Sequence, residues 1–426
     1  MDNNNFYSIR KIVSLLLIIS FFTVSFDIFL VLEIGPNIRI FQFLILVPIF
    51  YSLMLVLHRP IIIPLGFIPL LVWLLFIFLF IPNSGYIPKG IGYALWLFLN
   101  VLLIFALVQI INSKNFYRIF FWYITSFFFV ATFGLLQFSF ALIGFGELFM
   151  IKTWWFQDIF PRINGFSYEP SFFSTYLISG WILIIYLLNS NINFVNRKLL
   201  KFYFLIISFA IILSGSRMGW LVIFLVLAVF FLKFIYKFIR LKPIKHRHFY
   251  IIILFFFFIF AYILVTNIDY FSILTLGLSG ESKSVNTRLN STIDTFIVFF
   301  DSPFIGYSLG GVSSAIASLN NLSIDDFASA KIEGNMVLAE VLAASGIIGF
   351  VPFIIFLRSI FIKPFFLIRM NKSNDLSIIL YGIILATLIQ FFMLQFNQNI
   401  LRPYFWLNIA MLCVVYNLYK KKLNNE

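Results

Sequence analysis

Six charged residues in an otherwise apolar chain have the types and spacing that could do chemistry: Arg162, Glu169, Arg217, Arg288, Glu333 and Glu340. Arginine keeps its charge at physiological pH, and its planar fork of donors fits phosphate oxygens. A carboxylate within reach of a hydroxyl group can act as its general base. This combination predicts a site that binds an anionic group while it deprotonates a group nearby.

Arg217 is the most unusual of the six, because it lies between two apolar runs in "ILSGSRMGWLVIF" (211–223). A charged side chain near a helix end in lipid is costly unless an anion or a water-filled cavity meets it. The alternative is that Arg217 snorkels to the membrane interface. Arg288 has a similar alternative as a solvated residue on a helix face.

Glu169 follows Arg162 by seven residues in "PRINGFSYEPSFF" (161–173). Pro170 suits the first turn of a helix, so Glu169 could simply complement the dipole of that helix. A helix-terminal role and a catalytic role for Glu169 are both open.

Two further acids lie in "EGNMVLAEVLAASGIIGF" (333–350), which Glu333 opens. Glu340 lies two turns later on the same face, inside an apolar span, where an acid is a candidate functional residue. The small residues Ala339, Ala343, Gly346 and Gly349 are better explained by close helix packing.

Other kinds of site have little support. His58, His246 and His248 all fall beside basic residues in connecting segments, and Cys413 is the single cysteine. The sequence has no glycine-rich phosphate loop, no cluster of metal ligands and no Ser/His/Asp set. An ATPase or a hydrolase therefore has little support, and no cofactor is expected.

Composition defines the elements that must position these residues. Hydrophobic residues make up 62% of the 426 residues and charged residues 11%, against about a quarter charged in soluble proteins; the mean hydropathy is +1.03. The chain is therefore expected to be an all-α polytopic membrane protein that forms a single membrane domain over 1–426. Stretches long enough to cross about 30 Å of hydrocarbon predict about twelve spans, at 11–32, 39–57, 61–81, 91–111, 118–143, 170–188, 199–214, 218–237, 248–266, 335–357, 376–394 and 403–419.

The distribution of Lys and Arg predicts the orientation. With a cytoplasmic N-terminus, 21 of the 30 basic residues fall on the cytoplasmic side and both termini are cytoplasmic. The nine on the outer side are Arg39, Lys89, Lys152, Arg162, Arg217, Lys283, Arg288, Lys331 and Arg402. The net charge of +14 thus reflects topology, and no nucleic-acid partner is expected.

Two extracytoplasmic loops are longer than simple connections, at 144–169 and 267–334. Long loops are usually functional. The second is expected to be partly helical, because the apolar residues of 285–300 recur at helical spacing. Arg288, Thr292 and Thr295 lie on the polar face of that helix, which is expected to rest on the outer membrane surface and to end before Pro303 and Gly306.

Four segments resemble the O-antigen polymerase and ligase superfamily, and most closely the Wzy-type polymerases of O-antigen or capsule repeat units. They are "RINGFSYEPSFFSTYL" (162–177), "LSGSRMGWLV" (213–222), "TRLNSTIDTFIVFFDSPFIGYSLGG" (287–311) and "EGNMVLAEVLAASGIIGF" (333–350). The resemblance covers the chain from about residue 160. The segment with Arg162, Glu169 and Pro170 is more similar to polymerases than to ligases.

The resemblance implies metal-independent glycosyl transfer at the outer face of a bacterial inner membrane. The substrate would be a glycan linked to undecaprenyl pyrophosphate, and a chain-length regulator and a flippase of the same pathway would be partners. Arg217 and Arg288, with Arg162 third, would hold the leaving pyrophosphate. Asn335 and Glu340 would contact the substrate. Related sequences often have histidine where this chain has Gly334, so the base would be Glu169 or Glu333.

Three alternatives remain. An O-antigen ligase would transfer the glycan to a lipid A core, and a flippase or other transporter would place charges along a midplane pathway. A purely structural scaffold would not explain Arg217. Arg402 lies outside all four segments, and its substitution is expected to leave polymer length near the wild-type value.

Overall fold

The computed structural model describes residues 3–33, 37–146, 154–156, 160–190, 192, 194–240, 258, 283–321, 336–370, 374–396 and 399–425. Eleven long helices form the bundle in this part of the chain: α1 (Asn3–Thr23), α2 (Ile40–Val56), α3 (Phe67–Leu79), α4 (Ile87–Ile110), α5 (Phe116–Leu142), α6 (Pro170–Leu188), α7 (Arg197–Leu213), α8 (Arg217–Ile239), α14 (Val337–Met370), α15 (Asp375–Leu394) and α16 (Pro403–Asn425).

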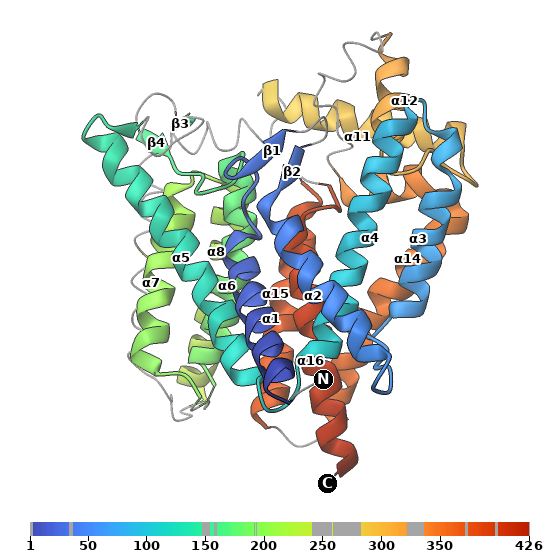
Figure 1. Ribbon diagram of the computed structural model, residues 1–426. Helices are drawn as coiled ribbons and strands as arrows, with labels where there is room; N and C mark the ends of the chain where they lie inside the picture. The colour runs from blue at the N-terminus through green and yellow to red at the C-terminus, as the bar shows by residue number, and fades with distance from the viewer. Residues whose placement is uncertain are drawn as a thin grey trace.

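Shorter elements gather at one end of this bundle (Figure 1). They are the antiparallel hairpins β1 (Val31–Glu33) with β2 (Asn37–Arg39) and β3 (Trp154–Phe156) with β4 (Phe160–Arg162), the 3-10 helix η1 (Ile81–Asn83), and the helices α11 (Lys283–Asp301) and α12 (Val312–Leu319). Both chain termini lie at the other end, so they lie on the same side of the bundle, as the predicted topology requires. Which end faces the cytoplasm stays a prediction from the Lys and Arg distribution.

The protein is a mostly helical membrane protein, as the composition predicts. Five described helices, α4, α5, α6, α14 and α15, are long and apolar enough to cross a membrane. The other predicted spans overlap shorter or less apolar helices, and the ninth, 248–266, lies outside the described residues except for Phe258. The number of twelve spans therefore stays a prediction.

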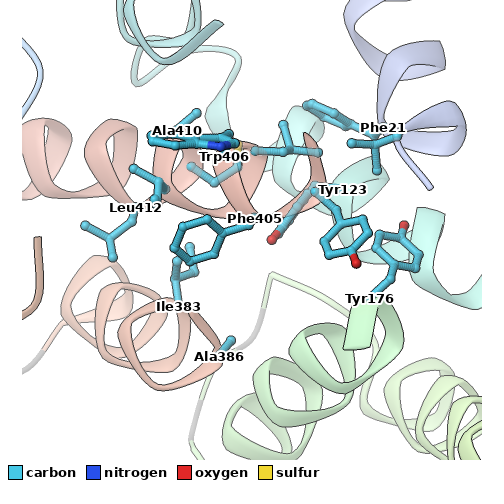
Figure 2. Packing of buried hydrophobic residues seen from close by; sticks show 14 of the residues in the cluster. Phe21, Tyr123, Tyr176, Ile383, Ala386, Phe405, Trp406, Ala410 and Leu412 are labelled. Atoms are coloured by element: carbon cyan, nitrogen blue, oxygen red, sulfur yellow. The ribbon is translucent and has the colours of Figure 1, made fainter. Parts of the chain in front are cut away.

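A chain of neutral polar side chains ties the helices together in the core. The Tyr123 hydroxyl of α5 donates to the Asn408 amide oxygen of α16, and the Asn408 amide nitrogen donates to Gln390 Oε1 of α15 at 2.6 Å. Gln390 in turn donates to the Thr175 carbonyl of α6 at 3.3 Å. Figure 2 shows Tyr123 among the aromatic and aliphatic side chains of this region. In an apolar surrounding such bonds hold helices in one register.

Helix α14 differs from the predicted span 335–357 in two ways. It begins at Val337 and continues to Met370, so the basic residues Arg358, Lys363 and Arg369 lie on a helix that extends past the expected end and not on a loop. It is also broken at Gly346, where φ is 56° and the backbone is not helical. Gly346 is thus more than a small packing residue, because it marks a discontinuity.

The turn that follows α11 fills this break. Ile347 N–H donates to the Pro303 carbonyl at 2.9 Å, while Tyr307 N–H and Ser308 N–H donate to the carbonyls of Ala343 and Ala344 at 3.1 Å and 2.7 Å. Backbone groups that a broken helix frees inside a membrane protein must find partners within the protein. The 303–308 turn supplies those partners.

Helix α11 appears where the periodicity predicts a helix, over 285–300. Its apolar residues Leu289, Ile293 and Phe300 are exposed on the protein, whereas Thr295 of the polar face is buried. The helix therefore turns its polar side to the bundle and its apolar side outward, which suits the membrane surface.

Reporter fusions test the orientation. Fusions after Asn112, Asn196 and Lys422 are expected to report a cytoplasmic position, and fusions after Gly85 and Asn399 an outer one, because the basic residues concentrate in the first set of segments. Alkaline phosphatase and fluorescent-protein activities measure this directly. The inverted pattern would move the conspicuous arginines to the cytoplasm and contradict the topology.

Gly306→Ala tests the insertion of the turn into α14. Gly306 has φ +75°, and a Cβ there would lie 2.6 Å from both the Ala343 oxygen and the Gly346 nitrogen. We expect this substitution to lower the free energy of unfolding by about 2 kcal/mol or more, measured as the thermal midpoint of the detergent-purified protein. Gly92→Ala is the control, since a Cβ at Gly92 of α4 meets nothing within 4 Å. Equal midpoints for the two variants would contradict the insertion.

Candidate functional site

Arg162 ends strand β4 and lies against the turn between α7 and α8. Its Nε donates to the Ser214 carbonyl at 2.9 Å, and the next backbone N–H, of Ile163, donates to the Leu213 carbonyl at 3.3 Å. Gly215 in this turn has φ +60°, and a Cβ there would lie 2.9 Å from Arg162 Nε. The turn therefore requires glycine at position 215 for two reasons. Its backbone conformation is one that other residues rarely adopt, and a side chain there would collide with the Arg162 guanidinium.

Arg217 is the first residue of α8, directly after that turn, and its side chain is exposed. Ser216 precedes it and accepts a hydrogen bond from the Gly219 N–H at 3.4 Å through its hydroxyl, as a helix-capping residue does. The positive end of the α8 dipole lies at this position. Arg162 therefore bonds to the turn that immediately precedes Arg217 and the N-terminus of α8, and a helix N-terminus with nearby arginines favours an anion.

Glu169 immediately precedes α6, with Pro170 as the first helical residue. Its carboxylate accepts a hydrogen bond from the Ser171 hydroxyl at 3.0 Å and makes no capping bond to the backbone of α6. A capping bond therefore does not explain Glu169, although the helix dipole still favours an acid there.

The first turns of α6 and α8 pack against each other. A Cβ at Gly219 of α8 would overlap the hydroxyl of Ser174 in α6, so the two backbones approach closely. This contact places the start of α6, which Glu169 precedes, against the start of α8, and Arg162 bonds to the turn before α8. We call this region, with Arg162, Glu169 and Arg217, the α6–α8 junction.

A buried ion-pair network supports the start of α6, and sequence reasoning missed it. Asp27, in the segment after α1, pairs with Arg39 at 2.8 Å and with Arg402 at 3.3 Å. The Arg402 guanidinium also stacks on the ring of Phe172, with Cζ 3.7 Å from the centroid. Arg402 is 7% exposed, so it is a buried, ion-paired residue and not a solvated loop residue. Asp27, an acid inside the predicted span 11–32, was the available signal.

The remaining predicted residues are not placed at this junction. Glu340 is buried in the first turn of α14, near Leu338, whose N–H donates to Gln395 of α15 at 3.0 Å. Helix α15 packs against both α14 and α6. Arg288 lies in α11, and Glu333 and Asn335 lie outside the described residues.

The described residues offer little to a metal ion, because no group of three or more His, Cys, Asp or Glu side chains gathers among them. The junction instead supplies fixed positive charge and a single carboxylate. It can hold an anion and accept a proton.

A family comparison accounts for part of the chain. Residues 202–354, about a third of the sequence, match the O-antigen ligase family. This match supports the resemblance of the chain to the O-antigen polymerase and ligase superfamily. Members of this superfamily are glycosyltransferase-like enzymes of surface-polysaccharide synthesis. No curated protein and no solved structure matches the chain.

The matched region runs from α7 into α14. It contains Arg217 and the α7–α8 turn, while Arg162 and Glu169 lie before it. The contacts at the α6–α8 junction therefore join the family-matched region to a segment outside it.

Arg402→Ala tests the role of the ion-pair network. Removing one partner of a buried pair leaves the other charge less compensated and typically costs 3 to 5 kcal/mol. Because Asp27 keeps Arg39, we expect about 3 kcal/mol of lost stability, seen as a lower thermal midpoint and reduced accumulation in the membrane. Arg59→Ala is the control, since Arg59 is exposed. A midpoint for Arg402→Ala equal to that of Arg59→Ala would contradict a structural role.

Proposed function

We propose that this protein polymerises oligosaccharide repeat units linked to undecaprenyl pyrophosphate into O-antigen or capsular polysaccharide. The reaction takes place at the outer face of the bacterial inner membrane. The observation that supports the proposal is the α6–α8 junction, where Arg162 bonds to the turn before α8 and the start of α6 packs against α8.

The arginines suit the leaving group. When the glycan leaves its carrier, negative charge develops on the pyrophosphate, and donors fixed in advance stabilise that charge by several kcal/mol. Arg217 extends from the first position of α8, while Arg162 is fixed through its Nε to the Ser214 carbonyl. Both keep their charge throughout the reaction.

Glu169 is the base that the junction provides. The hydroxyl oxygen of the acceptor sugar attacks the anomeric carbon of the donor glycan and forms the new glycosidic bond. The bond from that carbon to the pyrophosphate oxygen breaks, undecaprenyl pyrophosphate departs, and the hydroxyl proton passes to the Glu169 carboxylate. The Ser171 hydroxyl orients this carboxylate through its hydrogen bond.

The position of the charges favours an enzyme over a transporter. A transporter that moves an anionic lipid would place charged residues along a midplane pathway. The hydrogen-bonded core chain of Tyr123, Asn408 and Gln390 consists of neutral groups, whereas Arg162, Glu169 and Arg217 lie at the end of the bundle that also holds β4. A separate flippase would then deliver the substrate, and a chain-length regulator would set the product length.

The choice between polymerase and ligase depends on the acceptor. The segment "RINGFSYEP" (162–170), which builds the junction, resembles polymerases, and we therefore assign a second lipid-linked repeat unit as acceptor. A gel of surface polysaccharide from a strain lacking the gene separates the two. Single repeat units on lipid A core indicate a lost polymerase, whereas a core without any repeat unit indicates a lost ligase.

Arg217→Ala and Arg217→Lys test the mechanism in the same gel assay. Loss of a charge-assisted contact in the transition state should cost about 3 kcal/mol or more, on the order of a hundredfold in rate, so Arg217→Ala should abolish polymer. Arg217→Lys keeps the charge without the planar fork and should restore only part of the activity.

Arg59→Ala, an exposed arginine at a distant loop, is the matched control and should leave polymer length at the wild-type value. Western blots must show that all variants accumulate equally. Full-length polymer from Arg217→Ala would make Arg217 an interface anchor and remove the main residue of the mechanism.

A further inference from the structure

A second polar site lies at the same end of the bundle, between η1, the start of α4, α11 and α12. It is a pocket of about 290 Å³, close to the lower end of the ~300 to 1,000 Å³ typical of small-molecule sites. Its lining residues are Asn83, Gly85, Tyr86, Val298, Asp301, Tyr307, Ser314, Ala315, Ser318 and Leu319. Figure 1 shows α11 and α12 at this end, near the end of α3 and the start of α4.

Three hydroxyl groups of the pocket already donate their hydrogen atoms to groups within the protein. Tyr307 donates its hydroxyl hydrogen to Asp301, and the Ser314 and Ser318 hydroxyls donate to the carbonyls of Gly311 and Ala315 at 2.9 Å and 2.8 Å. A hydroxyl that donates its one hydrogen keeps acceptor capacity on its oxygen. The pocket therefore presents mainly acceptors, and a complementary ligand must bring O–H or N–H donors.

The charge of the pocket excludes a pyrophosphate. Asp301 carries the single formal charge among the lining residues, which include no Lys or Arg. Partial burial, with the hydrogen bond to Asp301 and the charge of Asp301, raises the pKa of Tyr307 to about 12, so Tyr307 stays protonated at neutral pH. An anion would be repelled by Asp301 and would find no cation among the lining residues, whereas a neutral, hydroxyl-rich group would meet acceptors beside Tyr86 and Tyr307.

We infer that this pocket binds a neutral sugar residue of the lipid-linked glycan, at a distinct place from the arginines that hold the pyrophosphate. The assignment rests on the proposed function for the identity of the glycan. Aromatic faces, a few fixed acceptors and an apolar wall of Val298, Ala315 and Leu319 are the usual make-up of a small-molecule site. A sugar ring has both the apolar faces and the hydroxyl donors that such a wall and such acceptors match.

The pocket is held in shape by the insertion of the turn into α14. The Tyr307 backbone N–H is bonded to Ala343 at 3.1 Å, and the Asn83 side chain donates to the Gly306 carbonyl at 3.3 Å. Ser308, next to Tyr307, donates its hydroxyl to the Ile77 carbonyl at 3.0 Å. A site built on fixed groups loses less entropy when it binds.

The test uses the full-length protein in detergent micelles and a defined probe. The probe is the repeat-unit oligosaccharide released by mild acid from the lipid-linked pool of the native strain, free of lipid and phosphate and with its amino groups acetylated. Titration calorimetry or saturation-transfer NMR should detect its binding to the wild-type protein. Asp301→Asn should weaken that binding about tenfold or more, because a charge-assisted bond is lost, and Ser318→Trp should block it by filling the pocket.

Asp294→Asn is the matched control. Asp294 lies on the same helix, its carboxylate accepts from Asn320 at 3.3 Å, and it is not part of the pocket lining. This variant should bind the probe like the wild type. Arg217→Ala should also bind the probe normally while it makes no polymer, so the two proposals fail independently.

Three results would overturn the pocket assignment. The first is that the wild-type protein does not bind the acetylated probe. The second is that Asp301→Asn and Ser318→Trp both bind the probe as tightly as the wild type. The third is binding that needs a free amino group on the sugar, which would make the pocket a site for an ammonium group beside Asp301. Full-length polymer from Arg217→Ala would instead contradict the proposed mechanism and would leave the pocket assignment unaffected.

Discussion

The requirement that buried backbone groups pair within the protein determines the structure at the end of the bundle that carries α11 and α12. Helix α14 is broken at Gly346, and the carbonyls of Ala343 and Ala344 would lack partners if the turn after α11 did not donate to them. Lipid offers no replacement for those bonds. The turn lies between α11 and α12. The need of the α14 carbonyls for hydrogen-bond donors therefore helps to determine where the pocket beside these helices lies. Gly306 allows the approach, because any side chain there would collide with the α14 backbone.

The described polar groups separate by charge along the same end of the bundle. The α6–α8 junction carries Arg162 and Arg217, and the pocket between α11 and α12 carries Asp301 and neutral acceptors. A lipid-linked glycan has the same polarity, with an anionic pyrophosphate at one end and neutral sugars at the other. Each part of such a substrate would then meet the surface that stabilises it, and the opposite placement would be repelled at Asp301.

Hydropathy and the distribution of basic residues were sufficient to predict a helical membrane protein, and periodicity alone predicted α11. The sequence could not predict what depends on distant partners. Asp27 and Arg402 lie 375 positions apart, and the break at Gly346 depends on a turn that precedes it by about forty residues. Arg358, Lys363 and Arg369 suggested a loop, yet they lie on α14, because long basic side chains at a helix end can reach the interface.

The buried ion pairs explain how two more arginines coexist with a site for an anion. Asp27 forms ion pairs with both Arg39 and Arg402. The Arg402 guanidinium also lies over the ring of Phe172, which is in the first turn of α6. These two arginines therefore hold the start of α6 and do not compete with Arg162 and Arg217 for a phosphate group. Since Glu169 directly precedes that turn, the same contact also supports the backbone that carries Glu169. The position of the start of α6 thus depends on one buried acid, Asp27.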